Sequence, residues 1–543
     1  MVKWTRNQWL SSSALSRFLG LSTLGIVSLF GVKDAKAFQL YDGQQHGNNL
    51  EINLSTTLSW TPIWRTQNPS AVLLANPNGD DGDRALAHGM VSNLFEALPV
   101  LDVKNGNYGM HLSGEFYWNP TYTGTNQNHQ GETLNYSVIN ANTFPRATVN
   151  VNGFNARLLD AFAYGTTHFG AGDQQTISMR VGRETVLWGQ SLFLSNNGLA
   201  GLMAPFDVQT ADNNPNAQTQ QIIEPIGQVE LTYQPNQIVT FQGYYKFQWQ
   251  PDFLPGAGSY FNGSDLAVPG SSRLVAVPGA FYLPRIKDNT PSGTDGQFGI
   301  STQLTLGNYD VGFYALRADS YSPVVAVTSS NQYQVVYPRD IWAEAASVST
   351  TVGAANVAGE VSFRQRMPLA QGTVIQLPDN NANSNPAYPI GNTWAAQASV
   401  IYLTPALPFD PGGITVDGEI GMNHVLAITA NREAMAGYSG LHRSSTAAEL
   451  QGTITPTYFN VLPNLQLAFP IGLHWNFYGR SMIDPTENSG TGNVNFGVQA
   501  TYKVVWIASV TYNDYFGAAN PNLAGEPSIA DRNYVMLNIQ RSF

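Results

Sequence analysis

The sequence predicts an all-β protein, a single transmembrane antiparallel β-barrel of about 18 strands, with about 16 as the alternative count. Three observations support this fold class. Apolar and polar residues alternate in many short runs, the connections between the runs alternate between short and long, and the last run ends on an aromatic residue. Alternation with a period of two is typical of strands whose two faces meet different surroundings. In a transmembrane barrel, one face meets lipid and the other meets water.

Composition agrees with such a barrel. Only 12% of the 543 residues are charged and 11% are aromatic, with 51 Gly and 31 Pro. Few charges, many aromatic residues and many turns are expected where lipid covers one face. Beyond the amino terminus, no stretch offers the roughly 18 apolar residues that a membrane helix needs. Since only helices and closed barrels satisfy every backbone group in lipid, a membrane protein of this sequence has to be a barrel.

The amino terminus predicts a secretory signal peptide at residues 1–37. A basic beginning leads into a short apolar core at 18–32, and an Ala-x-Ala cleavage site ends at Ala37. Cleavage there leaves residues 38–543 as one barrel domain. Removing 1–37 takes away five Lys or Arg and one Asp, which leaves 21 basic against 36 acidic residues, a net charge of −15. This charge argues against nucleic acid as a partner, and the absence of cysteine excludes disulfides and thiolate sites.

The runs define eighteen expected strands in chain order. The second and third are joined by 104–107, where Asn-Gly is typical of a tight hairpin. The expected strands are 52–60, 90–103, 108–118, 155–168, 176–187, 229–233, 239–249, 297–306, 309–317, 341–351, 356–364, 394–403, 414–421, 446–457, 465–477, 494–503, 505–515 and 534–543. In 465–477, Leu467, Phe469, Ile471 and Leu473 share the face expected to meet lipid, whereas Gln466, Gly472 and His474 share the face expected to meet the lumen.

The connections predict which end of the barrel faces the periplasm. The short ones include 104–107, 234–237, 307–308, 352–355 and 503–505. The long ones include 61–88, 119–154, 188–225, 250–296, 318–340, 365–393 and 422–445. Short periplasmic turns and long extracellular loops are the pattern of a bacterial outer-membrane barrel. A soluble β-propeller also has many strands, but no blade-length repeat is present here.

The last ten residues resemble the assembly signal of Gram-negative outer-membrane proteins. Phe543 ends the chain and Tyr534 lies nine residues upstream, although Arg541 departs from the usual apolar residue at its position. The resemblance implies the outer membrane of a Gram-negative bacterium as location, with its lipid and its assembly machinery as partners. A terminal strand of a soluble sandwich is the alternative. Oligomeric state stays open.

Four stretches also resemble the domain of unknown function 1302 family of Gram-negative outer-membrane β-barrel proteins. They are Gly82-Asp-Arg84, Arg180-Val-Gly-Arg-Glu-Thr-Val-Leu-Trp-Gly-Gln-Ser191, Tyr244-Tyr-Lys-Phe-Gln-Trp249 and Arg541-Ser-Phe543. The resemblance extends over nearly the whole chain after the leader. It implies a role in moving organic, often hydrophobic, compounds across the outer membrane, and it supplies no catalytic residues.

Charged and aromatic residues on the polar strand faces are candidates for the solute path. They are Arg180, Glu184, Tyr244, Lys246, Glu360, Arg364, Asp417 and Glu419. Arg180 and Glu184 either orient the polar end of a solute or pair with neighbouring lumen charges and brace the wall. The four charged residues of 356–364 and 414–421 are expected to face the lumen, where water requires polar side chains. Arg183 falls on the opposite face of its run. Because a lipid-facing arginine at the membrane midplane costs about 2–4 kcal/mol, Arg183 is expected near a rim or at a bulge.

The segment 191–225 is long and rich in apolar residues. Leu192, Phe193, Leu202, Met203 and Phe206 are the candidates for a constriction. A large apolar stretch is unfavourable in bulk water, so this segment is expected to fold into or over the lumen.

Two further kinds of site were considered. The acidic segment Asn76–Arg84 has oxygen ligands at alternate positions, but it lacks the Gly and Glu of an EF-hand loop. Calcium binding and a solvated acidic loop both remain open for it, and no metal site or cofactor is predicted. No catalytic signature is found either, so an enzyme is not expected.

The expected function is passive passage of a moderately hydrophobic organic solute. The polar face of 239–249 mixes hydroxyl and amide groups with Tyr244, so aromatic rings offer contact to an apolar solute while polar groups keep the path wet. A general size-selective porin is one alternative. A surface adhesin or structural barrel with partner-binding loops is the other.

Overall fold

A computed structural model describes residues 38–214, 216–217, 219–294, 296–369, 375–377, 388–407, 412–432 and 442–543. The expected signal peptide at 1–37 lies outside the described residues.

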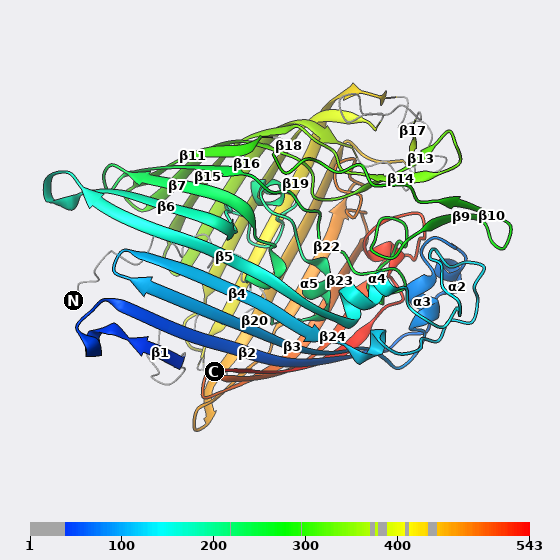
Figure 1. Ribbon diagram of the computed structural model, residues 1–543, viewed down its shortest axis with the longest axis horizontal. Coiled ribbons are helices and arrows are strands. Elements are labelled where there is room, and N and C mark those ends of the chain that lie inside the picture. The colour runs from blue at the N-terminus through cyan, green and yellow to red at the C-terminus, as the bar shows by residue number, and fades with distance from the viewer. Residues whose placement is uncertain are drawn as a thin grey trace.

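The described chain forms a closed antiparallel barrel of 18 strands, as the alternation predicts (Figure 1). Its wall consists of β2 (Leu50–Arg65), β3 (Met90–Asn105), β4 (Tyr108–Trp118), β5 (Phe154–Phe169), β6 (Gln175–Glu184), β7 (Ile226–Gln234), β8 (Val239–Lys246), β11 (Gln297–Leu306), β12 (Tyr309–Ala318), β15 (Ile341–Val352), β16 (Ala355–Pro368), β18 (Ile390–Leu403), β19 (Ile414–Ala430), β20 (Thr446–Leu462), β22 (Ile471–Tyr478), β23 (Thr491–Tyr502), β24 (Trp506–Phe516) and β25 (Tyr534–Ser542). Each strand pairs with the next in this order, and β25 pairs with β2 to close the ring.

Two further strands extend the same sheet. β21 (Leu465–Ala468) shares one position of the wall with β22, because both pair with β20 and with β23. β1 (Phe38–Asp42) pairs with the beginning of β2, beside the point where β25 ends. It thus covers a strand edge that the end of the chain would leave open.

The expected strand 465–477 is therefore two strands, separated by Phe469 and Pro470. Proline has no backbone N–H to donate to the ladder, so the strand is interrupted there. Ile471 is exposed on the outside and His474 faces inward, where it bonds Glu449 and Glu526. The alternation predicts the two faces correctly for these residues, but it does not reveal the break.

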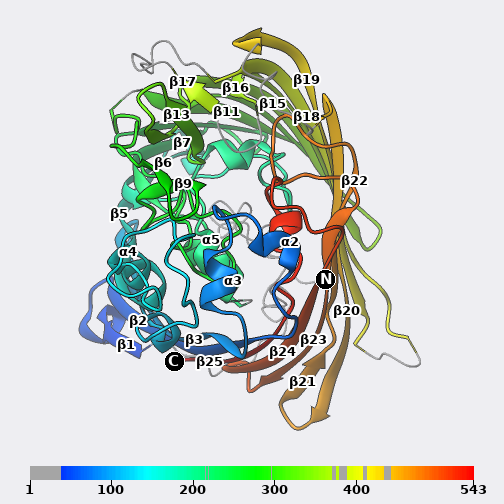
Figure 2. The same cartoon turned by 90° about the vertical axis from the view of Figure 1, so that its right-hand side faces the viewer.

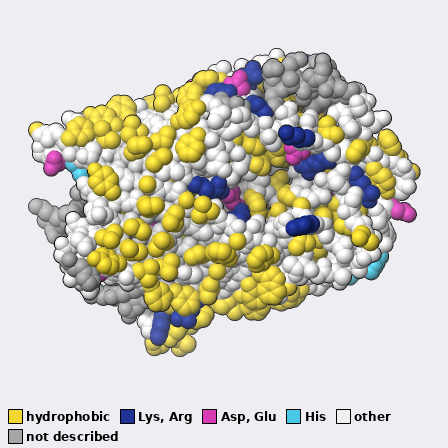
Figure 3. Space-filling model, viewed as in Figure 1, with side chains coloured by type: hydrophobic (Ala, Val, Ile, Leu, Met, Phe, Trp, Pro, Cys, Tyr) yellow, Lys and Arg dark blue, Asp and Glu magenta, His cyan; other side chains and the backbone are white. Residues whose placement is uncertain are grey.

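Exposure in this molecule is the reverse of that in a soluble protein. Large apolar side chains such as Ile300, Phe313 and Val361 are among the most exposed, whereas Glu96, Arg364 and Glu419 are buried. Figure 3 shows hydrophobic side chains spread over much of the wall. The outside of the barrel thus offers an apolar surface, and the polar groups lie within.

The long connections carry small strands of their own at the extracellular end (Figure 1). β9 (Arg273–Val277) and β10 (Phe281–Pro284) form a hairpin, and β13 (Val324–Thr328) pairs with β14 (Tyr333–Val336) and with β17 (Ile375–Leu377). The sequence analysis placed no strands in these loops. Most of the connection 365–393 beyond Leu369 lies outside the described residues.

Short helical turns fill the connections. They are η2 (Gly43–His46), α2 (Ala71–Leu74), α3 (Asp81–Ala85), η3 (Pro120–Tyr122), α4 (Arg146–Thr148), η4 (Val149–Gly153), η5 (Ala171–Asp173), η6 (Leu199–Leu202), α5 (Val208–Asn213), α6 (Thr219–Ile222) and η8 (Glu526–Ser528). None of the helices in the described ranges is long and apolar enough to cross a membrane.

Candidate functional site: the barrel interior

The segment between β6 and β7 lies inside the barrel. Figure 2 shows α5 within the ring of strands. The backbone N–H of Leu192 donates to Glu419 on β19, the Asn214 amide donates to Glu96 on β3, and the Asn216 amide donates to Asn538 on β25. The segment therefore crosses the interior and contacts well-separated parts of the wall.

Two wall carboxylates bind the backbone of its first half. Glu419 accepts N–H groups from Leu192 at 3.0 Å, Phe193 at 2.5 Å and Leu194 at 2.7 Å. Glu360 accepts the N–H groups of Gln190 at 2.7 Å and Leu199 at 2.6 Å. A loop without regular structure needs partners for its buried N–H groups, and ionised carboxylates are the strongest acceptors available.

Arg364 binds the same stretch through its carbonyl groups. Its guanidinium donates to the carbonyl oxygens of Asn196 at 3.1 Å, of Asn197, and of Gly198 at 2.8 Å. Glu360, Arg364 and Glu419 are all buried beneath the segment. These three solute-path candidates thus face the interior and bind the backbone of the internal segment there.

Tyr244 and Lys246 hold the two ends of this half. Lys246 Nζ donates to the Met203 carbonyl at 2.6 Å and to the Tyr321 hydroxyl at 2.7 Å. The Tyr244 ring packs on Trp188 with 4.9 Å between centroids. Gly299 faces these rings, and a Cβ there would lie 2.6 Å from Tyr244 Cε1 and 2.7 Å from Trp188 Cζ3. Glycine at this position is what lets the two rings pack against the wall.

Most of the apolar side chains of the segment that are constriction candidates are buried and do not face open space. Leu192, Leu202 and Met203 are buried, and the last two join an interior cluster that includes Trp188 and Tyr314. Of the five constriction candidates, only Phe193 and Phe206 keep a partly exposed side chain. Burial of Leu202 and Met203 in this cluster, which includes residues of β8, β12 and β15, removes apolar surface from water and favours the folded-in position of the segment.

Arg180 and Glu184 lie on the inner face of β6, as strand alternation requires. Their side chains form an ion pair at 2.8 Å, and Glu230 of β7 accepts from Arg180 at 2.7 Å. Asp417 lies on the inner face of β19, two residues from Glu419, and stays partly exposed. No hydrogen bond or ion pair joins Asp417 to the segment among the described residues.

The second half of the segment binds a charge cluster on β3 to β5. Arg157 pairs with Glu224 at 2.6 Å and also with Glu115 and Asp207. Burial raises the pKa of Asp207 to about 8, although Arg157 acts in the opposite direction. The Gln221 amide donates to Glu115 at 3.0 Å and to Glu96 at 2.7 Å.

The alternation of the sequence does not single out this cluster. Glu96 shares its strand face with Leu94 and Leu98, and all three are buried under the segment. Because leucines flank the glutamate, the sequence of that strand face does not indicate contact with a water-filled lumen. The available signal was that three consecutive expected strands each carry a charged residue, Glu96, Glu115 and Arg157, within a largely apolar run.

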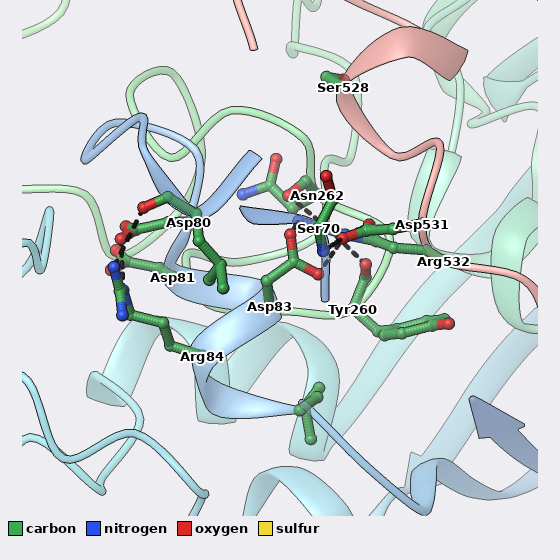
Figure 4. Close-up of polar contacts among 12 residues, drawn as sticks. Ser70, Asp80, Asp81, Asp83, Arg84, Tyr260, Asn262, Ser528, Asp531 and Arg532 are labelled. Carbon is green, nitrogen blue, oxygen red and sulfur yellow. Dashed lines mark hydrogen bonds and ion pairs between the residues drawn. The ribbon is translucent and has the colours of Figure 1, made fainter. Parts of the chain in front are cut away.

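A second buried network closes the extracellular end around the Gly82-Asp-Arg84 stretch. Figure 4 shows Asp83 of α3 beside Arg532. Asp83 pairs with Arg532 at 3.2 Å and with Arg65 of β2 at 2.8 Å. Burial alone would raise the pKa of Asp83, but the two arginines hold it below its usual value. Arg532 also donates to the carbonyl oxygens of Tyr260 at 2.5 Å and Asn262 at 2.7 Å.

The neighbouring acidic residues have protein partners. Asp80 pairs with Arg84, and Asp265 accepts the N–H groups of Asp81 at 3.2 Å and Gly258 at 3.1 Å. Within the described ranges, no group of three or more His, Cys, Asp or Glu side chains is placed to hold a metal ion. Calcium binding by Asn76–Arg84 stays an open question of the sequence.

Several solved structures are similar to the chain at low identity. Acinetobacter baumannii OccAB1 is 13% identical over 94% of this chain and 99% of its own, with a TM-score of 0.43. Acinetobacter baumannii OccAB2 is 9% identical over 91% and 98%, with a TM-score of 0.45. Pseudomonas aeruginosa OpdK, solved with vanillate, is 7% identical over 90% and 98%, with a TM-score of 0.41.

No curated protein matches the chain. A family model described as "Protein of unknown function (DUF1302)" matches residues 18–543, nearly the whole chain, and confirms the resemblance of the four sequence stretches. The chain belongs to the DUF1302 family.

Proposed function

We propose that this protein is an outer-membrane channel for the passive passage of moderately hydrophobic organic solutes. An apolar outer surface suits a hydrocarbon environment. Around most of the ring the backbone groups of each strand are hydrogen-bonded to the neighbouring strands, so they need no water. The expected signal peptide would direct the chain across the inner membrane. A barrel of this strand number is wide enough to conduct unless loops fill it.

The observation that carries the proposal is that many charged side chains on the inner wall, among the described residues, are bound by protein groups, although Asp417 stays partly exposed. Glu360, Arg364 and Glu419 bind the internal segment, and Arg180 pairs with Glu184 and Glu230. The inner-face residues left partly exposed on β7, β8, β11, β20 and β23 are mainly uncharged, and they include Thr232, Gln242, Gln303, Gln451, Thr453 and Asn495. Such a lining offers little attraction to small ions and tolerates a weakly polar solute.

Flux through purified protein in liposomes tests the proposal. Aromatic acids and sugars matched in size should enter at different rates, the aromatic acids faster. Equal rates at equal size would instead identify a general size-selective porin. No flux of either class would favour a surface-binding role for the extracellular hairpins β9–β10 and β13–β14.

A further inference from the structure

The wall is interrupted between β5 and β6. The β5–β6 ladder runs from Phe169 opposite Gln175 to Ala161 opposite Arg183, and it ends there. Residues 154–160 of β5 keep β4 on one side, but no described residue pairs with them in a ladder on the other side. After Glu184 the chain leaves the wall and enters the interior. We call residues 154–160, with the facing end of β6, the β5–β6 seam.

At this seam the Arg183 side chain bonds to the strand edge that no neighbouring strand covers. Arg183 Nε donates to the carbonyl oxygens of Leu158 at 3.1 Å and Leu159 at 2.9 Å. Its Nη atoms donate to Gln250 at 3.1 Å and to Glu224 at 3.2 Å. Side-chain bonds of this kind can break without loss of a strand ladder, so the seam can open while the β5–β6 pairing stays intact.

Glu224 connects this closure to the interior. Its carboxylate binds Arg183 through Oε2 and Arg157 through Oε1. Behind it, the Arg157 guanidinium carbon lies 4.1 Å from the centroid of the Phe253 ring. At its inner side the seam therefore has an aromatic ring and two arginines, and the two arginines share one carboxylate.

The outer side of the seam is apolar and accessible. Leu158 is 57% exposed and Phe154 is 63% exposed, and Phe116 on β4 is exposed next to them. In Figure 3 a small patch of basic and acidic side chains interrupts the hydrophobic surface of the wall. An unpaired strand edge is unfavourable in hydrocarbon unless it lines a cavity or is covered by protein. At this seam the cover consists of side chains, Arg183 with Gln250 and Glu224, and not of a strand.

We propose that the β5–β6 seam is a lateral passage between the barrel interior and the lipid, which Arg157, Arg183 and Glu224 close, and that it serves amphipathic organic solutes with an apolar body. The inference rests on the proposed function and adds a second route by which the same solutes pass. An apolar body is more soluble in lipid than in water and can contact Leu158 and Phe253, while the arginines meet a polar or acidic end. Sugars, which do not partition into lipid, keep to the path along the barrel axis.

A single cysteine tests the passage, because the natural chain has none. Leu158→Cys, modified with a bulky maleimide before reconstitution, places an obstacle on the lipid side of the seam. The matched control is Val361→Cys with the same label, since Val361 on β16 is 50% exposed on the outer surface away from the seam. Unlabelled variants and heat-modifiable gel migration verify folding.

Labelled L158C should lose most of its aromatic-acid flux, about tenfold or more, and keep its sugar flux, whereas labelled V361C keeps both. Unchanged aromatic-acid flux, or an equal loss of sugar flux, would overturn the lateral passage and leave the proposed function standing. Equal flux of both solutes through the unlabelled protein would reject the proposed function and the passage with it. Glu224→Gln supplies a second measurement, because loss of the shared carboxylate should raise aromatic-acid flux by a larger factor than sugar flux, and an equal rise of both would indicate only a loosened internal segment and contradict the passage.

Discussion

At the scale of single residues, the packing of the barrel interior depends on positions that matter because of the side chains they contact. Gly299 is one of them. It lies on β11 opposite Tyr244, at a place where the sequence shows only an ordinary strand glycine. Its missing side chain makes room for the Tyr244 and Trp188 rings, which in turn hold the beginning of the internal segment. The wall and the segment are thus matched in shape at this point.

Gly299→Ala should destabilise the protein by about 1–3 kcal/mol, because the added methyl group overlaps both rings. The thermal unfolding midpoint in detergent measures the effect. Gly243→Ala is the control, since Gly243 belongs to the same strand pair but its Cβ would meet only Gly299 O at 3.6 Å and Ile300 Cγ2 at 4.0 Å. Equal midpoints for the two variants would show that the close packing at Gly299 does not matter.

At the scale of elements, the internal segment behaves as a part of the wall. Its first half has little regular structure apart from η6, so its backbone groups bond to side chains on β16 and β19. Its second half bonds through side chains to β3, β4 and β5. Charges that strand alternation places inside the barrel are used to hold this element, which leaves the remaining inner surface mainly uncharged.

Glu419→Gln should loosen the stretch 192–194. The amide presents one neutral acceptor in place of a carboxylate, and each hydrogen bond to a charged group contributes about 1.5–3 kcal/mol. We expect a larger and noisier single-channel conductance in planar bilayers. Asp417→Asn, on the same strand face, removes a carboxylate that has no bond to the segment among the described residues, and its conductance should stay close to that of the natural protein. The same change in both variants would contradict the role assigned to Glu419.

At the scale of the whole molecule, the two ends of the barrel chain meet in one buried network. Asp83 lies near the start of the barrel, Arg532 lies just before its last strand, and Arg65 ends the first strand of the wall. The network also binds the loop at Tyr260 and Asn262. It therefore ties the closure of the ring to the layer that covers its extracellular end.

Asp83→Asn should lower stability at neutral pH by about 3–5 kcal/mol, because it leaves two buried arginines without their carboxylate. The pKa of Asp83 is lowered in the folded protein, so its contribution is present above the unfolded value of 3.8 and is lost as the pH falls through the folded value. Unfolding midpoints of the natural protein and D83N should therefore differ at pH 7 and converge below about pH 3.8. A difference that stays constant down to acid pH would contradict this role.

The limits of prediction from sequence are visible in particular elements. The run 155–168 corresponds closely to β5, because its residues alternate between lipid and interior along nearly all of its length. The run 176–187 extends beyond β6, which ends at Glu184. Val186 continues the apolar pattern, but it packs in the interior cluster after the chain has left the wall. Local periodicity cannot distinguish an apolar residue that meets lipid from one that meets an internal segment.

The sequence by itself determined the barrel, its strand number, the two faces of its strands and the family, since each of these depends on alternation or on motifs that are local in the chain. Only the tertiary structure decided what the inner charges do. Glu360 and Glu419 bind backbone groups about 160 to 230 residues away, and Arg157 of β5 and Arg183 of β6 share Glu224 beside an interrupted ladder. A side chain's polarity shows that it needs a partner, but which partner it finds depends on how distant segments pack, and no local pattern records that packing.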